Sequence, residues 1–124
     1  MRSPLVTLYG IANCDTVKKS RAWLTEHRVD HSFHDFKKQG VPADQLAQWA
    51  TQLGWESLVN KKGSTWRKLD AATQAAVVDA ASAQALMLRE SSVIKRPVVV
   101  NGLSNGKHIT VGYVPEVWAT WAKL

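Results

Sequence analysis

The chain has 124 residues, with 45% hydrophobic and 21% charged side chains, a composition typical of one globular domain. We therefore expect a single domain over residues 1–124. Cys14 is the only cysteine, which excludes an internal disulfide and a secreted disulfide scaffold. The formal net charge of +6 predicts an anionic partner, such as an oxyanion, a carboxylate-bearing small molecule or nucleic acid, unless it serves solubility alone.

The apolar start of the chain, PLVTLYGIA, is too short for a signal peptide or a membrane span. A lone thiol stays reduced in the cytoplasm. We therefore expect a cytoplasmic protein with no membrane partner.

The first part of the sequence predicts two strands and two helices. The stretch PLVTLYG favours a strand that ends at Gly10. An amphipathic helix follows over residues 15–27, with Asn13 as its expected N-cap. The stretch HSFHDF predicts a strand parallel to the first, because the helix between them can serve as a crossover. A helix then follows Pro42, with apolar residues at helical spacing: Leu46, Trp49, Ala50 and Leu53.

The middle of the chain predicts a loop and two further helices. Residues 60–65, NKKGST, are expected to form a basic loop. Asp70 is expected to cap a helix over residues 71–80, and Ser82 to cap another over residues 83–89.

The last part of the chain predicts a hairpin and a final helix. The stretch RPVVVNG favours a buried strand after Arg96, and an Asn105-Gly106 turn would pair it with a second strand. Pro115 begins a helix whose expected apolar face holds Val114, Val117, Trp118 and Trp121. The order β-α-β, helical stretch, β-β-α predicts an α/β fold with a four-stranded mixed sheet flanked by helices.

Cys14 lies where the first long helix begins, which predicts a reactive thiol. Unpaired N–H groups of the first turn point toward the sulfur, and the helix dipole favours a negative charge there. Lys18, Lys19 and Arg21 add positive potential, whereas Asp15 opposes it. We expect a lowered thiol pKa and hence more of the nucleophilic thiolate. The alternative is a buried and inert cysteine, against which the polar Asn-Cys-Asp-Thr context argues.

Val17 stands where a C-x-x-C motif would place its second cysteine. The chain therefore cannot resolve a mixed disulfide on Cys14, and a thiol from outside must do so. Glutathione is the abundant cytosolic candidate, and its two carboxylates suit a basic site.

Four segments in this order, YGIANCDTVKKSRAWL, NKKGSTWRKL, IKRPVVV and VGYVPEVW, resemble the ArsC/Spx family and, in detail, its YffB-type branch. The resemblance spans nearly the whole chain. It implies a thioredoxin-like fold with a helical insert between the βαβ and ββα halves. The family comprises glutaredoxin-type arsenate reductases and related thiol proteins, and the branch is described as glutathione-dependent thiol reductases.

The resemblance also implies roles for single residues. Cys14 matches the family's nucleophile. Pro97 matches the proline that these folds keep in cis beside the active cysteine. Arg96 matches an arginine that binds the oxyanion in the arsenate reductases, although an arginine fork suits a glutathione carboxylate equally well.

Two departures from the family pattern bear on the activity. The arsenate reductases use further arginines, whereas the loop here reads Asn60-Lys61-Lys62 and the region near the last strand reads Val111-Gly112-Tyr113. The loss of these arginines argues against arsenate reduction. The Spx regulators commonly show C-x-x-C, which this chain lacks, and nothing in the sequence carries over their binding to RNA polymerase.

The remaining candidates have a structural as well as a binding interpretation. Asn13 either donates to the thiolate or substrate or caps the helix, and we favour the cap. Lys18 and Lys19 either steer anions or form a solvated helix face. Arg67 belongs with Asn60 and Lys61 to the loop that faces the active site in the family.

The histidines and tryptophans point to structure. His31 and His34 have odd spacing on a strand and face opposite sides, which argues against a shared metal. The helical spacing of Trp49, Trp118 and Trp121 is typical of a core. We expect no nucleic-acid partner, because base stacking needs exposed aromatics within a basic surface.

We therefore expect a monothiol oxidoreductase with Cys14 as its nucleophile. Glutathione or another small thiol is the expected co-substrate, with no tightly bound cofactor and no metal, and a protein disulfide or an oxyanion is the expected substrate. The alternatives are an arsenate reductase-like enzyme and a non-catalytic, Spx-like regulator that binds a protein. The residues expected to bind substrate or glutathione are Asn13, Thr16, Lys19, Asn60, Lys61, Arg96 and Pro97.

Overall fold

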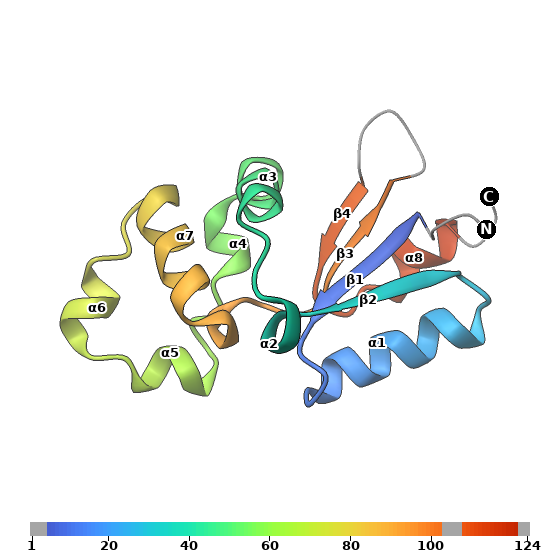
Figure 1. Cartoon of the computed structure of the whole chain (residues 1–124), viewed down its shortest axis with the longest axis horizontal. Helices are drawn as coiled ribbons and strands as arrows, with labels where there is room; N and C mark the ends of the chain where they lie inside the picture. Colours follow the sequence, from blue (N-terminus) through green and yellow to red (C-terminus); the bar gives the residue numbers. More distant parts are fainter. Residues whose placement is uncertain (1–4, 103–107, 122–124) are drawn as a thin grey trace. The chain divides into compact units, whose positions relative to one another are not determined.

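The computed structural model describes residues 5–102 and 108–121, and the chain divides into two compact units (Figure 1). Unit 1 comprises Met1–Gln39 with Arg96–Leu124, and unit 2 comprises Gly40–Lys95. The single domain expected over the whole chain stays a prediction. Unit 1 contains β1 (Val6–Gly10), α1 (Asp15–Glu26), β2 (His31–Asp35), α2 (Phe36–Gln39), β3 (Val98–Asn101), β4 (His108–Val111) and α8 (Pro115–Trp121). Unit 2 contains α3 (Ala43–Leu53), α4 (Trp55–Leu58), α5 (Ser64–Lys68), α6 (Ala71–Ala75), α7 (Ala80–Arg89) and the 3₁₀ turn η1 (Ser91–Val93).

Unit 1 is built on a four-stranded mixed sheet with the strand order β2-β1-β3-β4. β1 pairs with β2 in parallel and with β3 antiparallel, and β3 pairs with β4 antiparallel. This arrangement confirms the predicted sheet, the parallel second strand and the pairing of the last two strands. The predicted Asn105-Gly106 turn lies outside the described residues.

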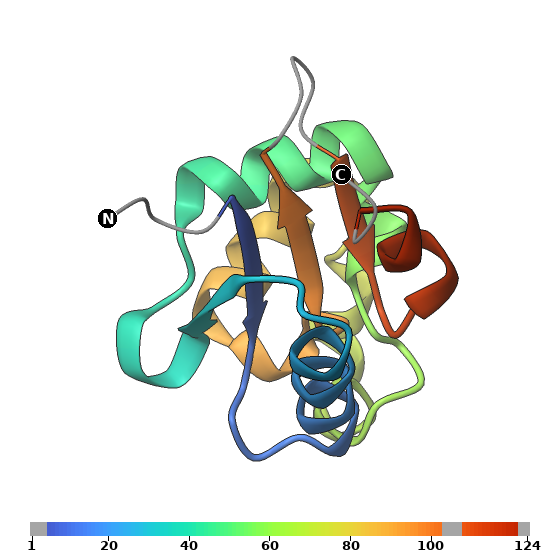
Figure 2. The same cartoon turned by 90° about the vertical axis from the view of Figure 1, so that its right-hand side faces the viewer.

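Helices α1 and α8 cover one face of this sheet (Figure 2). The strands contribute alternate residues to this core, because successive side chains of a strand point to opposite faces. Val117 is an exception to the predicted apolar face of α8, since its side chain is 40% exposed. A helix of seven residues presents a narrow face, and the two tryptophans occupy it. The core contains Val6, Leu8, Val17, Leu24, Val29, Val99, Trp118 and Trp121.

Gly10 allows the end of β1 to approach α1 closely. A Cβ atom at this position would lie 2.7 Å from Cγ2 of Val17, which is closer than carbon atoms pack. Val17 itself is fully buried. The glycine therefore sets how near the first turn of α1, and with it Cys14, sits to the end of the central strand.

Unit 2 is helical, and its last segment is joined to the segment that follows α4. Val59 and Ile94 form an isolated antiparallel bridge, and the N–H of Lys95 donates to the carbonyl of Leu58 at 2.7 Å. Helix α3 confirms the predicted helix after Pro42, and Trp49 is buried as predicted.

Three predicted boundaries in unit 2 are wrong. The basic loop is shorter than residues 60–65, because Ser64 already begins α5. The helix that Asp70 caps ends at Ala75 instead of residue 80. The next helix begins at Ala80, with Asp79 as its N-cap.

Ser82 is the third residue of α7 and not its cap. It forms a capping box with Asp79: the Ser82 N–H donates to Oδ1 of Asp79 at 2.9 Å, and the Asp79 N–H donates to Oγ of Ser82 at 3.1 Å. Both residues are good caps, and the reciprocal bonds place the start of the helix at the earlier one.

No helix within residues 5–102 and 108–121 combines the length and the apolar character that a membrane crossing requires.

Candidate functional site

Cys14 is the N-cap of α1, and the loop from the end of β1 leads into it. Its backbone is extended, with φ −146° and ψ 123°, and its carbonyl accepts the first helical hydrogen bond from the N–H of Lys18 at 2.9 Å. The prediction that Asn13 caps the helix is therefore wrong. Asn13 is exposed and lies one residue before the cap, too early to accept from the first turn. Its role in binding stays a prediction.

The Cys14 thiol lies half-buried against the core of unit 1, with hydrogen-bond donors around it. Burial is the largest single influence and raises the pKa of the thiol. The N–H of Val17, the side chain of Arg96 and the N–H of Thr16 act in the opposite direction, because each stabilises the thiolate. Together they hold the pKa of Cys14 below its ordinary value, as the sequence predicts.

The donors differ in part from those expected. The N–H groups of the first turn act as predicted, but the charge that lowers the thiol pKa comes from Arg96, and Lys18, Lys19 and Arg21 are not among its causes. All three side chains are exposed on α1, away from its buried face.

Arg96 reaches Cys14 from the segment that leads into β3. The peptide bond between Arg96 and Pro97 is cis, as predicted. The carbonyl of Pro97 accepts a hydrogen bond of 2.8 Å from the N–H of Gly112, which follows β4. Gly112 has φ +85°, a conformation that favours glycine. Both ends of the hairpin are thereby joined beside the segment that carries Arg96.

Lys19 forms a second cationic position on α1. Its Nζ lies 4.2 Å from the centroid of the Tyr113 ring, within the range of a cation–π contact. The Tyr113 ring packs edge-on against Trp118, with centroids 5.6 Å apart and planes at 87°. The core thus holds Tyr113, and Tyr113 positions the Lys19 ammonium.

Asn60 and Lys61 belong to unit 2, and their part in the site stays a prediction. The Asn60 N–H donates to the carbonyl of Val93 at 2.8 Å. The Lys61 Nζ lies over two tryptophan rings, at 5.8 Å from the centroid of Trp55 and 5.4 Å from that of Trp66. Arg67 donates to the carbonyl of Lys62 at 2.8 Å, so its guanidinium supports this loop.

The structure therefore brings together Cys14, Thr16 and Arg96, with Pro97 next to Arg96 in the chain. Two residues contribute to the site in ways that the sequence did not predict, Val17 and Tyr113. Val17 is prominent in the sequence as a missing cysteine, yet its N–H is the main donor to the thiolate. Tyr113 lies within the VGYVPEVW segment that resembles the family, but the resemblance assigned no role to this residue.

The two strand histidines lie in different surroundings. Nδ1 of His31 lies 2.8 Å from the carbonyl of Val29, and the ring of His34 packs 5.0 Å from that of Tyr9. Within the described part of the chain, no three histidine, cysteine or acidic side chains gather in a way that could hold a metal ion.

Comparison with known proteins places this chain and its fold in a family. The sequence profile of the ArsC family matches residues 9–121. A Haemophilus influenzae protein described as uncharacterized is 41% identical over 83% of this chain and 87% of its own. The global transcriptional regulator Spx of Streptococcus pyogenes is 26% identical over 78% of this chain and 72% of its own.

Two solved structures share both sequence and fold with the chain. A protein named YFFB is 43% identical, with a TM-score of 0.83 over 93% of this chain and 96% of its own. An arsenate reductase (ArsC) related protein from Brucella melitensis is 44% identical, with a TM-score of 0.70 over 100% of this chain and 99% of its own. These matches, with the mixed sheet and the helical unit between β2 and β3, confirm the predicted fold. The chain belongs to the ArsC family, with arsenate reductase-like proteins and Spx regulators among its relatives.

Proposed function

We propose that this protein is a monothiol oxidoreductase that uses Cys14 as its nucleophile and glutathione as the resolving thiol. One observation carries the proposal: the thiol of Cys14 sits at the start of α1, where the N–H groups of Val17 and Thr16 and the Arg96 side chain together lower its pKa. Thiolate is the form that attacks sulfur. Family membership supports a thiol-based redox reaction, and the relatives named for arsenate reduction support the same class of chemistry.

In the first step, the Cys14 thiolate attacks one sulfur of a substrate disulfide. A new S–S bond forms between Cys14 and that sulfur, the old S–S bond breaks, and the other sulfur leaves as a thiolate. With a mixed disulfide of glutathione and a protein thiol, Cys14 takes the glutathionyl group and the protein thiol is released in reduced form.

In the second step, a glutathione thiolate attacks the glutathionyl sulfur on Cys14. Oxidised glutathione forms, and the bond to Cys14 breaks to regenerate its thiolate, so one reduced glutathione is consumed for each glutathionylated protein thiol that is released. The chain has one cysteine, so no second thiol within it can take this step.

Arg96 and Lys19 are the cations that we assign to the carboxylates of glutathione. Arg96 hydrogen-bonds the Cys14 sulfur and is only partly exposed, which strengthens its interaction with an anion. Lys19 is held over Tyr113 and keeps its ammonium exposed to a ligand. Within unit 1, Asn13, Thr16 and the backbone beside Pro97 complete the proposed binding set, and a part for Asn60 and Lys61 stays an expectation from the family resemblance.

The test is turnover of 2-hydroxyethyl disulfide with reduced glutathione, with the oxidised glutathione measured through glutathione reductase and NADPH. We expect activity from the wild type and none from Cys14→Ser. As a matched control, Cys14→Ser/Ser57→Cys keeps one thiol per chain but moves it to an exposed position on α4. This variant should stay inactive, because an exposed thiol outside the site lacks the donors that surround Cys14. Turnover by either variant at the wild-type rate, or none by the wild type, would contradict the proposal.

The same assay separates the alternative functions. Arsenate in place of the disulfide would be reduced by an arsenate reductase, and a partly buried Arg96 beside the thiol favours oxyanion binding. A non-catalytic regulator would turn over neither substrate. We expect the disulfide to be the better substrate, because Arg96 is the only guanidinium that the structure places at the thiol within residues 5–102 and 108–121.

A further inference from the structure

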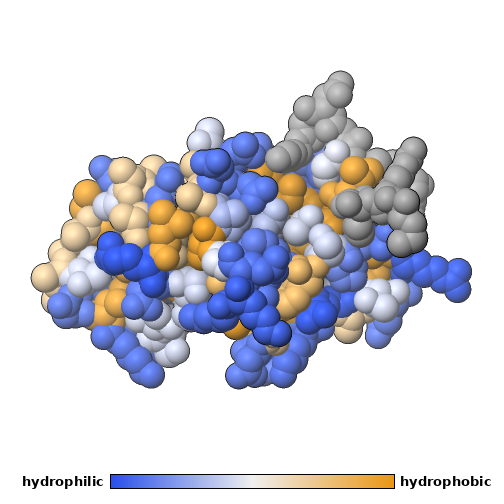
Figure 3. Space-filling model, in the orientation of Figure 1, coloured by the Kyte–Doolittle hydropathy of each residue, from blue (hydrophilic) through white to orange (hydrophobic). Residues whose placement is uncertain are grey.

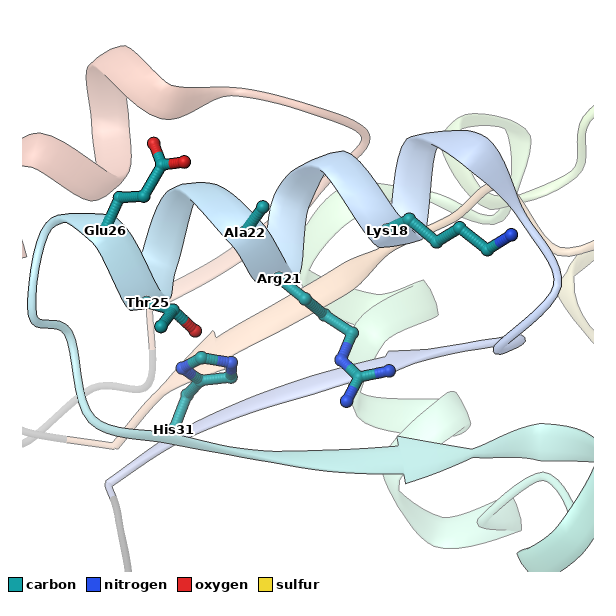
Figure 4. Close-up of a pocket in the computed structure, with 6 residues that line it drawn as sticks. All are labelled: Lys18, Arg21, Ala22, Thr25, Glu26 and His31. Atoms are coloured by element: carbon teal, nitrogen blue, oxygen red, sulfur yellow. The ribbon is translucent and has the colours of Figure 1, made fainter.

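A shallow groove of about 430 Å³ lies between α1 and the edge strand β2 (Figure 4). Arg21 and Thr25 point from α1 toward β2, and His31 points from the start of β2 toward α1, so the three side chains share one space. Glu26 points away from that space, and Ala22 and Lys18 complete the lining. A second groove of about 380 Å³ adjoins it and shares Thr25 and His31. We call the first hollow the α1–β2 groove.

The α1–β2 groove is basic at the end nearer Cys14. Lys18 and Arg21 line this end, and the Lys18 side chain extends toward the start of α1 (Figure 4). The opposite end is of mixed charge, because Glu26 borders the groove there and both Arg28 and Asp30 line its neighbour. Hydrophilic side chains cover the visible surface around α1, at the lower right of Figure 3.

Arg21 is fixed in a geometry that suits a carboxylate. Its guanidinium carbon lies 4.2 Å from the centroid of the Phe33 ring, and Phe33 packs against the core of unit 1. Stacking on an aromatic ring orients the planar guanidinium and leaves its N–H edge available to an anion. Less side-chain freedom is therefore lost when an anion binds.

The basic end of the groove lies within reach of a substrate bound at Cys14. Lys18, Arg21 and Thr25 lie at intervals of three and four residues, which places the three on one face of α1, and Cys14 precedes them as the N-cap of the same helix. At about 1.5 Å per residue, Arg21 lies about 10 Å along the helix from Cys14. An extended peptide covers this distance in about three residues.

We propose that the α1–β2 groove binds an acidic segment of a protein substrate, with Asp or Glu two to three residues from the cysteine that reacts with Cys14. The inference rests on the proposed function and names its substrate class: proteins whose disulfide or glutathionylated cysteine is flanked by carboxylates. Arg21 pairs with one carboxylate, and Lys18 with another nearer the thiol.

The charge distribution selects a peptide over nucleic acid. A nucleic-acid backbone requires a continuous track of positive charge. Here the charges beyond Thr25 are of both signs, because Arg28 and Asp30 both line the adjoining groove. A short acidic segment matches the two cations at the end nearer Cys14, whereas a long run of phosphates would also meet the Asp30 carboxylate.

A binding measurement tests the groove apart from catalysis. A cysteine-free nonapeptide with a central Glu-Asp pair is titrated into the ¹⁵N-labelled wild type at low salt. The control is the same peptide with Gln-Asn in place of Glu-Asp. We expect the acidic peptide to shift the amides of Lys18, Arg21, Thr25 and His31, and we expect Arg21→Glu to weaken binding by about tenfold. Lys38→Glu makes the same charge change on α2, outside the groove, and should leave binding within about twofold of wild type. Shifts confined to other residues, or equal binding of both peptides, would overturn the inference, as would tighter binding of a single-stranded oligonucleotide at these amides.

Turnover then separates this inference from the proposed function. Glutathionylated peptides with Asp or Asn at the second and third positions from cysteine are compared with 2-hydroxyethyl disulfide. We expect the wild type to show about three- to tenfold higher kcat/KM for the acidic peptide, a preference that falls with salt. Arg21→Glu should raise the KM for the acidic peptide, so that the neutral peptide becomes the better substrate. The kcat/KM for 2-hydroxyethyl disulfide should stay at the wild-type value. Equal turnover of both peptides beside active reduction of the small disulfide would overturn the groove alone. No turnover of any disulfide would contradict the proposed function. The peptide titration would then decide whether the groove binds an acidic segment.

Discussion

Two opposing influences act on the pKa of the Cys14 thiol: burial of the sulfur and hydrogen bonds donated to it. Burial disfavours its charged form, while Val17, Thr16 and Arg96 favour it. Only Arg96 among these is a side chain that can be removed without changing the helix. A single substitution therefore separates the contribution of Arg96 from that of the helix start.

The pH dependence of alkylation measures the pKa of the Cys14 thiol. The rate of alkylation by iodoacetamide rises with pH as thiolate forms, and it reaches half its plateau at the thiol pKa. In the wild type we expect this midpoint below the ordinary value of about 8.5. Arg96→Met should move it to higher pH, because the thiolate loses a hydrogen bond and a positive charge.

Lys18→Met is the matched comparison for Arg96→Met. It removes a cation from α1, one turn from Cys14. Lys18 is not among the groups that lower the pKa of the thiol. We expect its alkylation midpoint to equal that of the wild type. A shift in Lys18→Met as large as that in Arg96→Met would show that the charge of the whole helix activates the thiol.

Residue chemistry was predictable from the sequence where it depends on local order. The position of Cys14 at a helix start follows from the strand pattern before it and the amphipathic pattern after it. The contact of Arg96 with the thiol joins residues more than eighty positions apart, and only the family resemblance pointed to it. The stacking of Lys19 on Tyr113 has no sequence signal, because cation–π pairs need no fixed spacing.

At the scale of elements, the contact between β1 and α1 sets the position of the reactive cysteine. Gly10 and Val17 meet where the strand ends and the helix starts, and a Cβ at Gly10 would overlap Val17. Gly10→Ala must therefore separate the two elements or shift Val17 from the core. We expect it to lower the free energy of unfolding by about 1–3 kcal/mol, measured by urea denaturation.

Two further variants test this contact. Gly102→Ala adds the same methyl group at the end of β3, where the nearest atom would be the Leu5 carbonyl oxygen at 3.5 Å, and it should change stability by less than about 0.5 kcal/mol. Gly10→Ala/Val17→Ala should be more stable than the sum of its single variants predicts, because the smaller side chain makes room. Additive effects would show that the two residues do not press on each other.

The elements themselves were predicted unevenly. Strands and long helices follow from alternation and helical spacing, so β1, α1, β2, α3 and β3 matched closely. The short helices of unit 2 did not, because Asp79 and Ser82 are both good caps and only their reciprocal bonds decide between them. Asn13 failed as a cap for a related reason: residue type favoured it, but the backbone turns into the helix one residue later.

In the whole molecule, all four strands of the sheet belong to unit 1, and the helical unit 2 is inserted in the sequence between two of them. Residues 40–95 lie between β2 and β3 in sequence, while β1 and β3 are adjacent in the sheet. The thiol, Arg96, Pro97 and Lys19 all belong to unit 1. Asn60 and Lys61 belong to unit 2, where two tryptophan rings hold the lysine ammonium. The resemblance assigned these two residues to binding, and charge alone could not have done so.

The relatives bound the range of activities. The fold is shared with proteins named for arsenate reduction and for transcriptional regulation, so the fold does not select the function. The chain has one cysteine, whose thiol pKa is lowered, and it holds no second cysteine that could resolve an adduct. We therefore propose that Cys14 accepts a glutathionyl group and returns it to a second glutathione.

Intact-protein mass spectrometry tests this claim most directly. The reduced wild type is incubated with oxidised glutathione, its mass is measured, and reduced glutathione is then added. We predict one glutathionyl adduct per chain, mapped to Cys14 by peptide digestion, that reduced glutathione removes with formation of oxidised glutathione. An unmodified wild-type mass, or an adduct on Cys14 that reduced glutathione does not remove, would contradict the account.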